Sequence, residues 1–113
     1  MKIVTDTLPI AELKNMATNF FDGMVKAVVD IQREAIAVDA QLHADLEALL
    51  LQDGSAQKNL WGINIYPDLP GEQFVEFDSM INMRPSQGNK SRSVENEQIR
   101  QEILSVVAKR FAR

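Results

Sequence analysis

The chain has 113 residues, a length typical of one domain, and its 45% apolar content provides for a single hydrophobic core. The 12 Lys and Arg against 16 Asp and Glu give a formal net charge of −4, which argues against a general nucleic-acid binder or a polybasic membrane anchor. Because cysteine is absent, disulfides, thiolate metal sites and cysteine nucleophiles are excluded. We therefore expect one domain over residues 1–113.

Neither a membrane span nor a signal peptide is indicated by the sequence. The longest unbroken apolar runs, such as Ala48–Leu51, are far shorter than the roughly 18 residues that a span needs. Polar residues 5–7 stand where a signal peptide would be apolar. We expect a cytoplasmic protein that does not associate with a membrane.

The first elements in chain order are a strand over residues 2–5 and a helix that follows Pro9, a residue suited to a first helical turn. Gly23 is expected to end this helix, because glycine enters the left-handed conformation without a steric penalty. The apolar residues between recur every three or four positions and form one helical stripe: Ile10, Leu13, Met16, Ala17, Phe20 and Phe21.

Residues 24–39 allow two interpretations. Apolar and polar residues alternate from Val25 to Ile31 and again at Ile36 and Val38, which predicts two strands joined by a charged hairpin turn over 32–34. That turn lacks Gly, Asn and Pro, so its turn chemistry is weak. One continuous helix is the alternative, but it would place polar residues on its core stripe. The hairpin is therefore favoured.

The rest of the chain predicts a helix, two strands and a final helix. Leucines spaced three and four apart predict a helix over 42–52, and alternation predicts a strand over 61–66 that ends at Pro67. A second alternating segment over 75–83 predicts another strand, with Ile81 and Met83 on its apolar face. The last helix begins at Glu95 or Glu97 and ends near Phe111, with acids early and bases late, as the helix dipole favours.

The element order β-α-β-β-α-β-β-α predicts an α+β fold: an antiparallel or mixed five-stranded sheet with three helices packed on one face. The predicted core consists of Leu13, Phe20, Val29, Leu46, Leu49, Ile63, Ile65, Phe77, Ile81, Ile103 and Val107. The opposite sheet face would carry polar residues: Lys26, Asp30, Asn64, Tyr66, Asp78 and Asn82.

Two sequence strings are distinctive, LWGINIYP over residues 60–67 and FDSMINMRPSQGN over residues 77–89. With residues 25–31 and the string LHAD over 42–45, they resemble a small prokaryotic family catalogued as a domain of unknown function. The resemblance covers most of the chain. It implies a compact one-domain unit and carries no activity or functional residues with it.

The segment from Arg84 to Ser93 holds three bases and no acid, and it leads into the N-terminus of a helix. Free helix amides and arginine forks both favour anions, so one interpretation is an anion-binding loop. The other is a solvated connector whose arginines pair with acids of the sheet. The candidate ligand-binding residues of this loop are Arg84, Ser86, Gln87, Asn89 and Arg92.

His43, the single histidine, is the candidate catalytic base, with Asp45 as its carboxylate neighbour. The alternative is a partly exposed residue of a first helical turn. A metal site has no support, because one helical His–carboxylate pair supplies too few ligands. Asn64 and Asn82 would line a binding floor if their strands pair in register, or else belong to a solvated face or a subunit contact.

Sequence motifs of several enzyme classes are missing: GxSxG, GxxxxGK[ST] and GxGxxG do not occur. The preferred hypothesis is a small non-enzymatic module that binds a protein partner or itself, without a cofactor.

A homodimer is expected, because helices on one face leave a sheet face or edge open. The alternatives are a domain that binds a small phosphate or carboxylate through the 84–93 loop, and a small enzyme with His43 as base. An acidic protein surface is a further possible partner for that loop.

Overall fold

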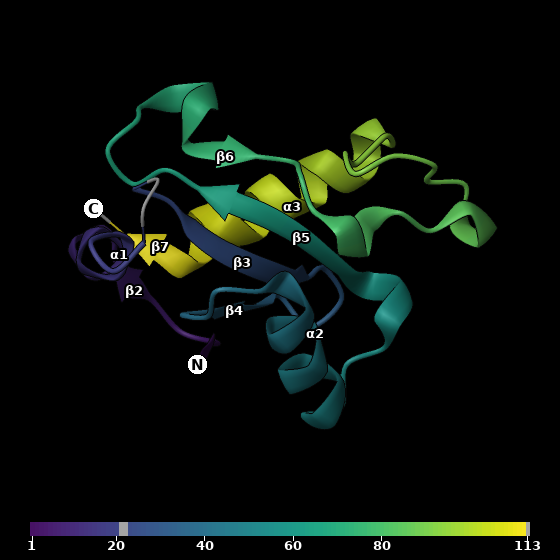
Figure 1. Ribbon diagram of the computed structural model, residues 1–113, viewed down its shortest axis with the longest axis horizontal. Coiled ribbons are helices and arrows are strands. Elements are labelled where there is room, and N and C mark those ends of the chain that lie inside the picture. Colours follow the sequence, from purple (N-terminus) through teal and green to yellow (C-terminus); the bar gives the residue numbers. More distant parts are fainter. Residues whose placement is uncertain (21–22, 113) are drawn as a thin grey trace.

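A computed structural model describes residues 1–20 and 23–112. Its strands are β1 (Lys2–Val4), β2 (Leu8–Pro9), β3 (Val25–Asp30), β4 (Ala35–Val38), β5 (Leu60–Ile65), β6 (Val75–Glu76) and β7 (Phe111–Ala112). Its α-helices are α1 (Ile10–Ala17), α2 (His43–Gln52) and α3 (Glu97–Arg110). The fold is α+β, as predicted, with a five-stranded antiparallel sheet in the order β1-β4-β3-β5-β6 and a small parallel pair, β2-β7 (Figure 1).

The hairpin over residues 24–39 is confirmed as β3 and β4. Its turn is held by Asp30, whose side chain is fully buried and accepts hydrogen bonds from the backbone N–H groups of Gln32 and Arg33, at 2.9 and 3.0 Å. The second carboxylate oxygen accepts a hydrogen bond from the Ser55 hydroxyl at 2.6 Å. These contacts replace the turn chemistry that Gly, Asn or Pro would have provided.

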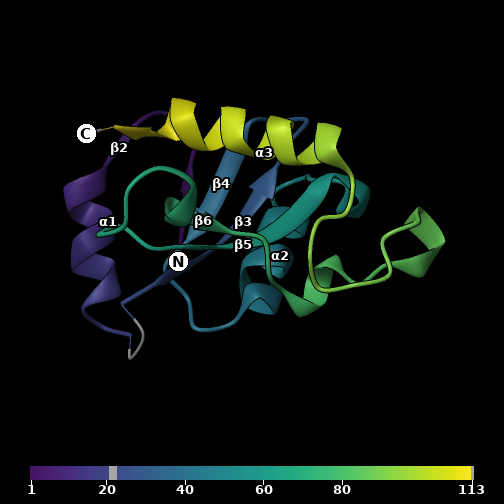
Figure 2. The same cartoon turned by 90° about the horizontal axis from the view of Figure 1, so that it is seen from above.

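One face of the sheet is apolar along its whole length. Val25, Ala27 and Val29 of β3 lie opposite Ile65, Ile63 and Trp61 of β5, and all six side chains are buried. The apolar stripes of α1 and α3 pack on this face; their buried members are Leu13, Ala17, Ile103, Val106 and Val107. Figure 2 shows α3 lying across this side of the sheet.

The prediction that all three helices share one face is wrong. Leu46 and Leu50 of α2 pack against Val28 and Ala37, whose side chains point to the opposite face. Figure 2 accordingly shows α2 on the other side of the strands from α3. A leucine stripe reveals which side of a helix is buried but carries no information on which sheet face it covers. Helices therefore cover part of both faces.

The predicted strand over 75–83 is also wrong beyond Glu76. The chain leaves the sheet and forms a short 3₁₀ helix over Met80–Asn82, which lies on the second face next to β5. Gly62 makes this approach possible, because a Cβ at its position would lie 2.5 Å from Cβ of Ser79 and 3.1 Å from Cγ1 of Ile81. Met83 is consequently exposed rather than on an apolar strand face.

Most of the predicted core is buried, with local exceptions. Phe20, Leu49, Phe77 and Ile81 are only partly buried. The predicted helical residue Phe21 lies outside the described residues. Three residues predicted to lie on the polar face of the sheet are buried: Asp30, Asn64 and Asn82. In the described part of the chain, no helix has the length and apolarity needed to cross a membrane.

Candidate functional site

A row of polar side chains crosses the second face of the sheet. The register aligns Lys26 of β3 with Asn64 of β5, and Asn64 with Glu76 of β6, so the three lie side by side on neighbouring strands. Residues at aligned positions of a sheet point to the same face. This row lies beyond the apolar patch that α2 covers.

Asn64 occupies the centre of the polar row and is only 5% exposed. Its Nδ2 donates hydrogen bonds to Oε1 of Glu76 at 2.8 Å and to the carbonyl oxygen of Asp78 at 3.2 Å. Two acceptors at this end fix the orientation of the amide. Its Oδ1 is buried and has no hydrogen-bond partner among the described residues.

His43, the first residue of α2, lies over the same part of the sheet. Its Nε2 donates a hydrogen bond to the carbonyl oxygen of Ile63 at 2.8 Å, so in the neutral ring Nδ1 carries the free lone pair. Burial lowers the pKa of His43 below 6.5, a shift that the Ile63 carbonyl opposes. The ring is therefore oriented by a backbone carbonyl, whereas Asp45 points to solvent as an exposed residue of the first turn.

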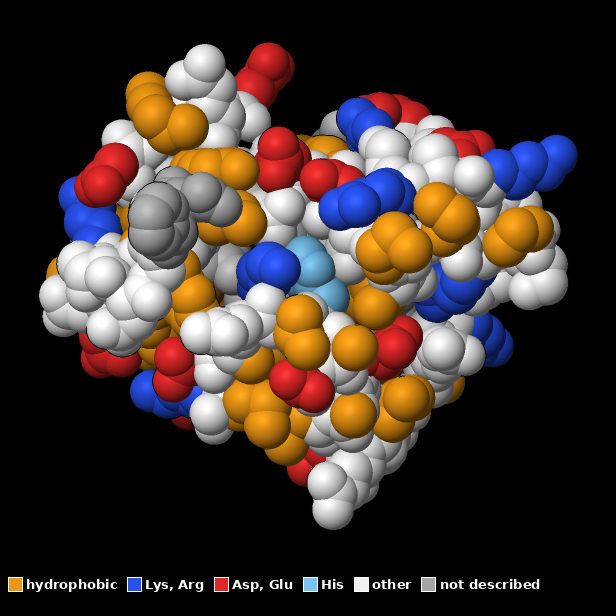
Figure 3. All heavy atoms as spheres, in the orientation of Figure 1, with side chains coloured by type: hydrophobic (Ala, Val, Ile, Leu, Met, Phe, Trp, Pro, Cys, Tyr) orange, Lys and Arg blue, Asp and Glu red, His pale blue; other side chains and the backbone are white. Residues whose placement is uncertain are grey.

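Three charged groups influence the pKa of His43. Lys26 and Arg92 lower the pKa of His43 and Asp78 raises it, which places all three within electrostatic range of the imidazole. Nε of Arg92 donates a hydrogen bond to Oδ1 of Asp78 at 2.7 Å. Figure 3 shows the histidine on this face, with Lys or Arg side chains and Asp or Glu side chains around it. The structure thus brings together His43, Asn64 and Arg92 of the predicted site residues.

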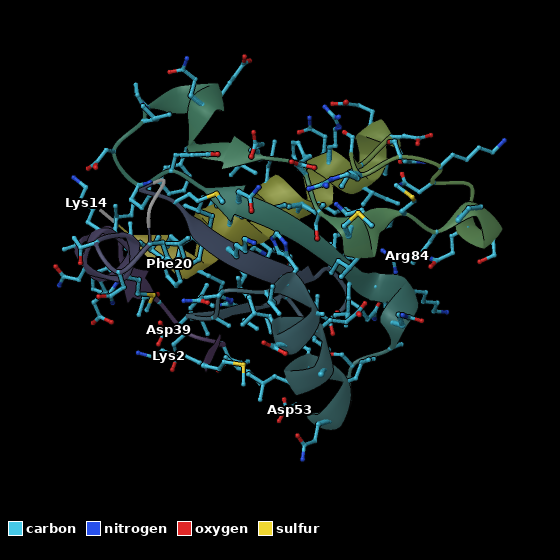
Figure 4. The ribbon with its side chains drawn as sticks, in the orientation of Figure 1. Lys2, Lys14, Phe20, Asp39, Asp53 and Arg84 are labelled. Carbon is cyan, nitrogen blue, oxygen red and sulfur yellow. The ribbon has the colours of Figure 1, made fainter. Side chains whose placement is uncertain are left out.

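Arg84 lies away from this cluster, at the far end of β5 (Figure 4). Its Nη1 donates to the carbonyl of Gln57 and its Nη2 to the carbonyl of Leu60, both at 2.6 Å. The guanidinium also stacks 4.2 Å from the centre of the Trp61 ring. Burial lowers the pKa of Arg84, and the negative charge of Glu47 opposes the shift. Arg84 therefore ties the 84–93 loop to the sheet.

Two more asparagines of the predicted site, Asn82 and Asn89, also bind backbone groups. Asn82 pairs with both the N–H and the carbonyl of Gly62, at 2.8 and 2.9 Å, as a neighbouring strand would. Asn89 donates to the carbonyls of Asn82, Ser91 and Ser93 and accepts from the N–H of Glu95. These contacts define the shape of the loop.

Gln87 donates to the Lys58 carbonyl at 3.4 Å, and Ser86 is exposed. The described residues contain no group of three or more His, Asp or Glu side chains placed to hold a metal ion.

A second feature, which the sequence interpretation missed, is an apolar trough on the other side of the molecule. A cavity of about 910 Å³ lies between α3 and the segment 71–77, lined mainly by apolar side chains. A smaller one of about 380 Å³ shares Ile10 and Phe74 with it and continues toward α1. The apolar lining comprises Ile10, Phe74, Val75, Phe77, Leu104, Val107, Ala108 and Phe111.

Two residues of the polar row, Lys26 and Glu76, were not singled out from the sequence as site residues. Because Lys26 and Glu76 alternate with apolar residues, the sequence predicts which sheet face they lie on. It does not predict that they lie beside Asn64, because that depends on the register between the strands. The trough had a weak sequence signal, because Leu104 adds an apolar position beside the buried stripe of α3.

The fold and these two surfaces define the chain as a small α+β protein with an antiparallel sheet that helices cover in part on each face. The model of the family described as protein of unknown function DUF5674 matches residues 2–110, and the chain belongs to that family. No curated protein and no solved structure matches the chain.

Proposed function

We propose that this domain is a non-enzymatic module that binds an apolar segment of a partner protein in the trough. The observation that carries the proposal is the trough itself, because a cavity of about 910 Å³ lies near the upper end of the volumes of binding pockets and its lining is mainly apolar. Leu104 is 37% exposed in its wall, so apolar surface is available for a partner to cover.

The charges of the trough favour a partner with Lys or Arg beside its apolar residues. Glu72 and Glu97 line the trough, and neither makes an ion pair within the described part of the chain. Arg100 also lines it, but its Nε and Nη2 donate to the Val94 carbonyl and the Ser93 hydroxyl. Its guanidinium stacks 4.7 Å from the centre of the Phe77 ring. The available charges are therefore acidic, and complementary charge selects a basic partner.

Selection from a library of random displayed peptides of about 15 residues, roughly the length at which an isolated helix becomes marginally stable, tests the proposal. The enriched peptides should combine apolar residues with Lys or Arg. Leu104→Asp should weaken their binding at least about tenfold, the loss of one well-buried contact. Leu51→Asp is the matched control, because Leu51 is 40% exposed on α2, on the other face.

Three outcomes contradict the proposal: no enrichment, enrichment of acidic peptides, or equal effects of Leu104→Asp and Leu51→Asp. The homodimer stays a prediction, and light scattering on the same preparations tests it. A dimer that Leu104→Asp dissociates would make a second copy of this chain the occupant of the trough in place of a partner protein.

A further inference from the structure

We infer that the polar row on the second sheet face is a separate binding site for a small anion that also carries a hydroxyl or amino donor. Its anionic group would lie on Lys26, and its donor would be accepted by Oδ1 of Asn64. The inference is independent of the trough, because Lys26, Asn64 and Glu76 alternate with the residues that face α1 and α3.

The first support is the unpaired oxygen of Asn64. A buried polar atom without a hydrogen bond costs about 1–3 kcal/mol, so a native structure needs a reason to keep one. Exchanging the amide nitrogen and oxygen does not remove the problem, because the oxygen would then face the Glu76 carboxylate and the Asp78 carbonyl. Nδ2 is taken up by partners on the β6 side of Asn64, and the aligned residue on its other side is Lys26 of β3.

The second support is the charge pattern around this oxygen. Among the described residues, Lys26 makes no ion pair, whereas Asp78 is paired with Arg92. Glu76 accepts hydrogen bonds from Asn64 and from the hydroxyl of Tyr66. Arg92 thus neutralises Asp78, and Glu76 keeps its charge but already accepts two hydrogen bonds. The ammonium of Lys26 is the cation in the row that is available to an anion.

The third support is the position of His43. Its Nε2 is engaged with the carbonyl of Ile63, the residue before Asn64 on β5, so Nδ1 is left as a second acceptor over this part of the sheet. The helix that His43 begins has no side-chain cap, and the positive end of its dipole favours an anion here. Cationic groups and acceptors at one place fit a hydroxy acid or a sugar phosphate better than a simple inorganic anion.

NMR of the His43 ring protons provides the test, because the chain contains a single histidine. Glycerol 3-phosphate and glycerate are the probes that combine an anion with hydroxyls, and they distinguish phosphate from carboxylate. Inorganic phosphate and acetate supply the charge alone, and glycerol supplies the hydroxyls alone. We expect saturable shifts with at least one combined probe and at least about tenfold weaker binding of its matched simple anion.

Lys26→Gln should weaken that binding about tenfold or more, since it removes one charge-assisted hydrogen bond. Lys58→Gln is the matched control, because Lys58 is an exposed lysine outside the polar row, and it should leave the affinity unchanged. Asn64→Ala should remove the preference for the combined probe over the simple anion. If that variant does not fold, comparing the affinities of Lys26→Gln and Lys58→Gln still tests whether the anion binds at the polar row.

Three results would overturn the inference. The first is the absence of any shift at about 10 mM of either combined probe, which excludes a Kd near 1 mM. The second is equal affinity for the combined probe and the simple anion, which would indicate an adventitious ion only. The third is unchanged affinity in Lys26→Gln.

Discussion

The two faces of the sheet are built from the same strands but differ in what covers them. On the face toward α1 and α3, each aligned pair of β3 and β5 is apolar and buried. On the other face, only the part around Val28 and Gly62 is apolar and covered by α2 and the 3₁₀ helix, while the row through Asn64 is polar. The first face therefore contributes to the hydrophobic core along its whole length. The second face contributes to the core only where α2 and the 3₁₀ helix cover it, and its remaining part presents polar side chains.

The largest expected loss of stability comes from a substitution in the core that covers the first face. Ile103 is fully buried on α3 and Leu104, the next residue, is 37% exposed. Ile103→Ala should lower the free energy of unfolding by about 2–5 kcal/mol, because it leaves a cavity in the core. Leu104→Ala should change it by about 0.5 kcal/mol or less. Urea denaturation of both variants measures the difference in the free energy of unfolding. Equal losses would contradict the conclusion that the buried stripe of α3 stabilises the fold.

The apolar half of the second face depends on Gly62. A Cβ at this position would overlap Ser79, so Gly62→Ala should cost about 1–3 kcal/mol through overpacking. Ser79→Gly removes the two closest atoms, and the double variant should lose less than the sum of the two single ones. Urea denaturation over this mutant cycle gives the coupling energy. Additive effects would show that the 3₁₀ helix does not rest on Gly62.

Arg84 tests whether its loop is a structural connection. Arg84→Lys keeps the charge but cannot reproduce the two-carbonyl contact and the stacking on Trp61, so it should cost about 1.5–3 kcal/mol. Arg92→Lys is the control, because the Arg92–Asp78 pair is about half exposed and surface pairs contribute about 0–1 kcal/mol. Melting temperatures of both variants provide the measurement. A larger loss for Arg92→Lys would contradict the assignment.

The smallest expected effect concerns pH and the polar half of the second face. The folded pKa of His43 lies below its usual 6.5, so the unfolded chain binds more protons than the folded one between the two values. The contribution of His43 is therefore fully present above pH 6.5 and is lost as the pH falls toward the folded pKa. His43→Gln should abolish this part of the pH dependence, measured as the free energy of unfolding at several pH values.

The central hairpin could be predicted because apolar residues recur at every second position of β3 (Val25, Ala27 and Val29), and Ile36 and Val38 continue this spacing in β4. The face covered by α2 could not, because an apolar stripe fits either side of a sheet. The strand predicted over 75–83 failed for a related reason. Its period of two is real, but Ser79 and Asn82 turn toward Gly62 instead of extending the ladder.

The candidate site shows the same limit. His43 and Asn64 were singled out by residue type, and Arg92 by its basic segment. They lie close together because of the register of β3, β5 and β6 and because His43 bonds to Ile63. All of these contacts join residues that are far apart in the sequence. The structural role of Arg84 was hidden because its partners are backbone carbonyls, which carry no residue-specific signal.

The parallel pair β2–β7 has a consequence for the order of assembly. Leu8 pairs with Phe111, and Arg110 donates to the carbonyls of Asp6 and Glu34. The bond from Arg110 to Asp6 joins residues 104 positions apart, so this closure carries a large entropic cost. On a ribosome, the central hairpin emerges and can pair early, whereas β2 waits for its partner until synthesis has passed residue 112. β2 therefore stays without its partner strand for most of translation, whereas β1 can pair with β4 as soon as the hairpin has formed.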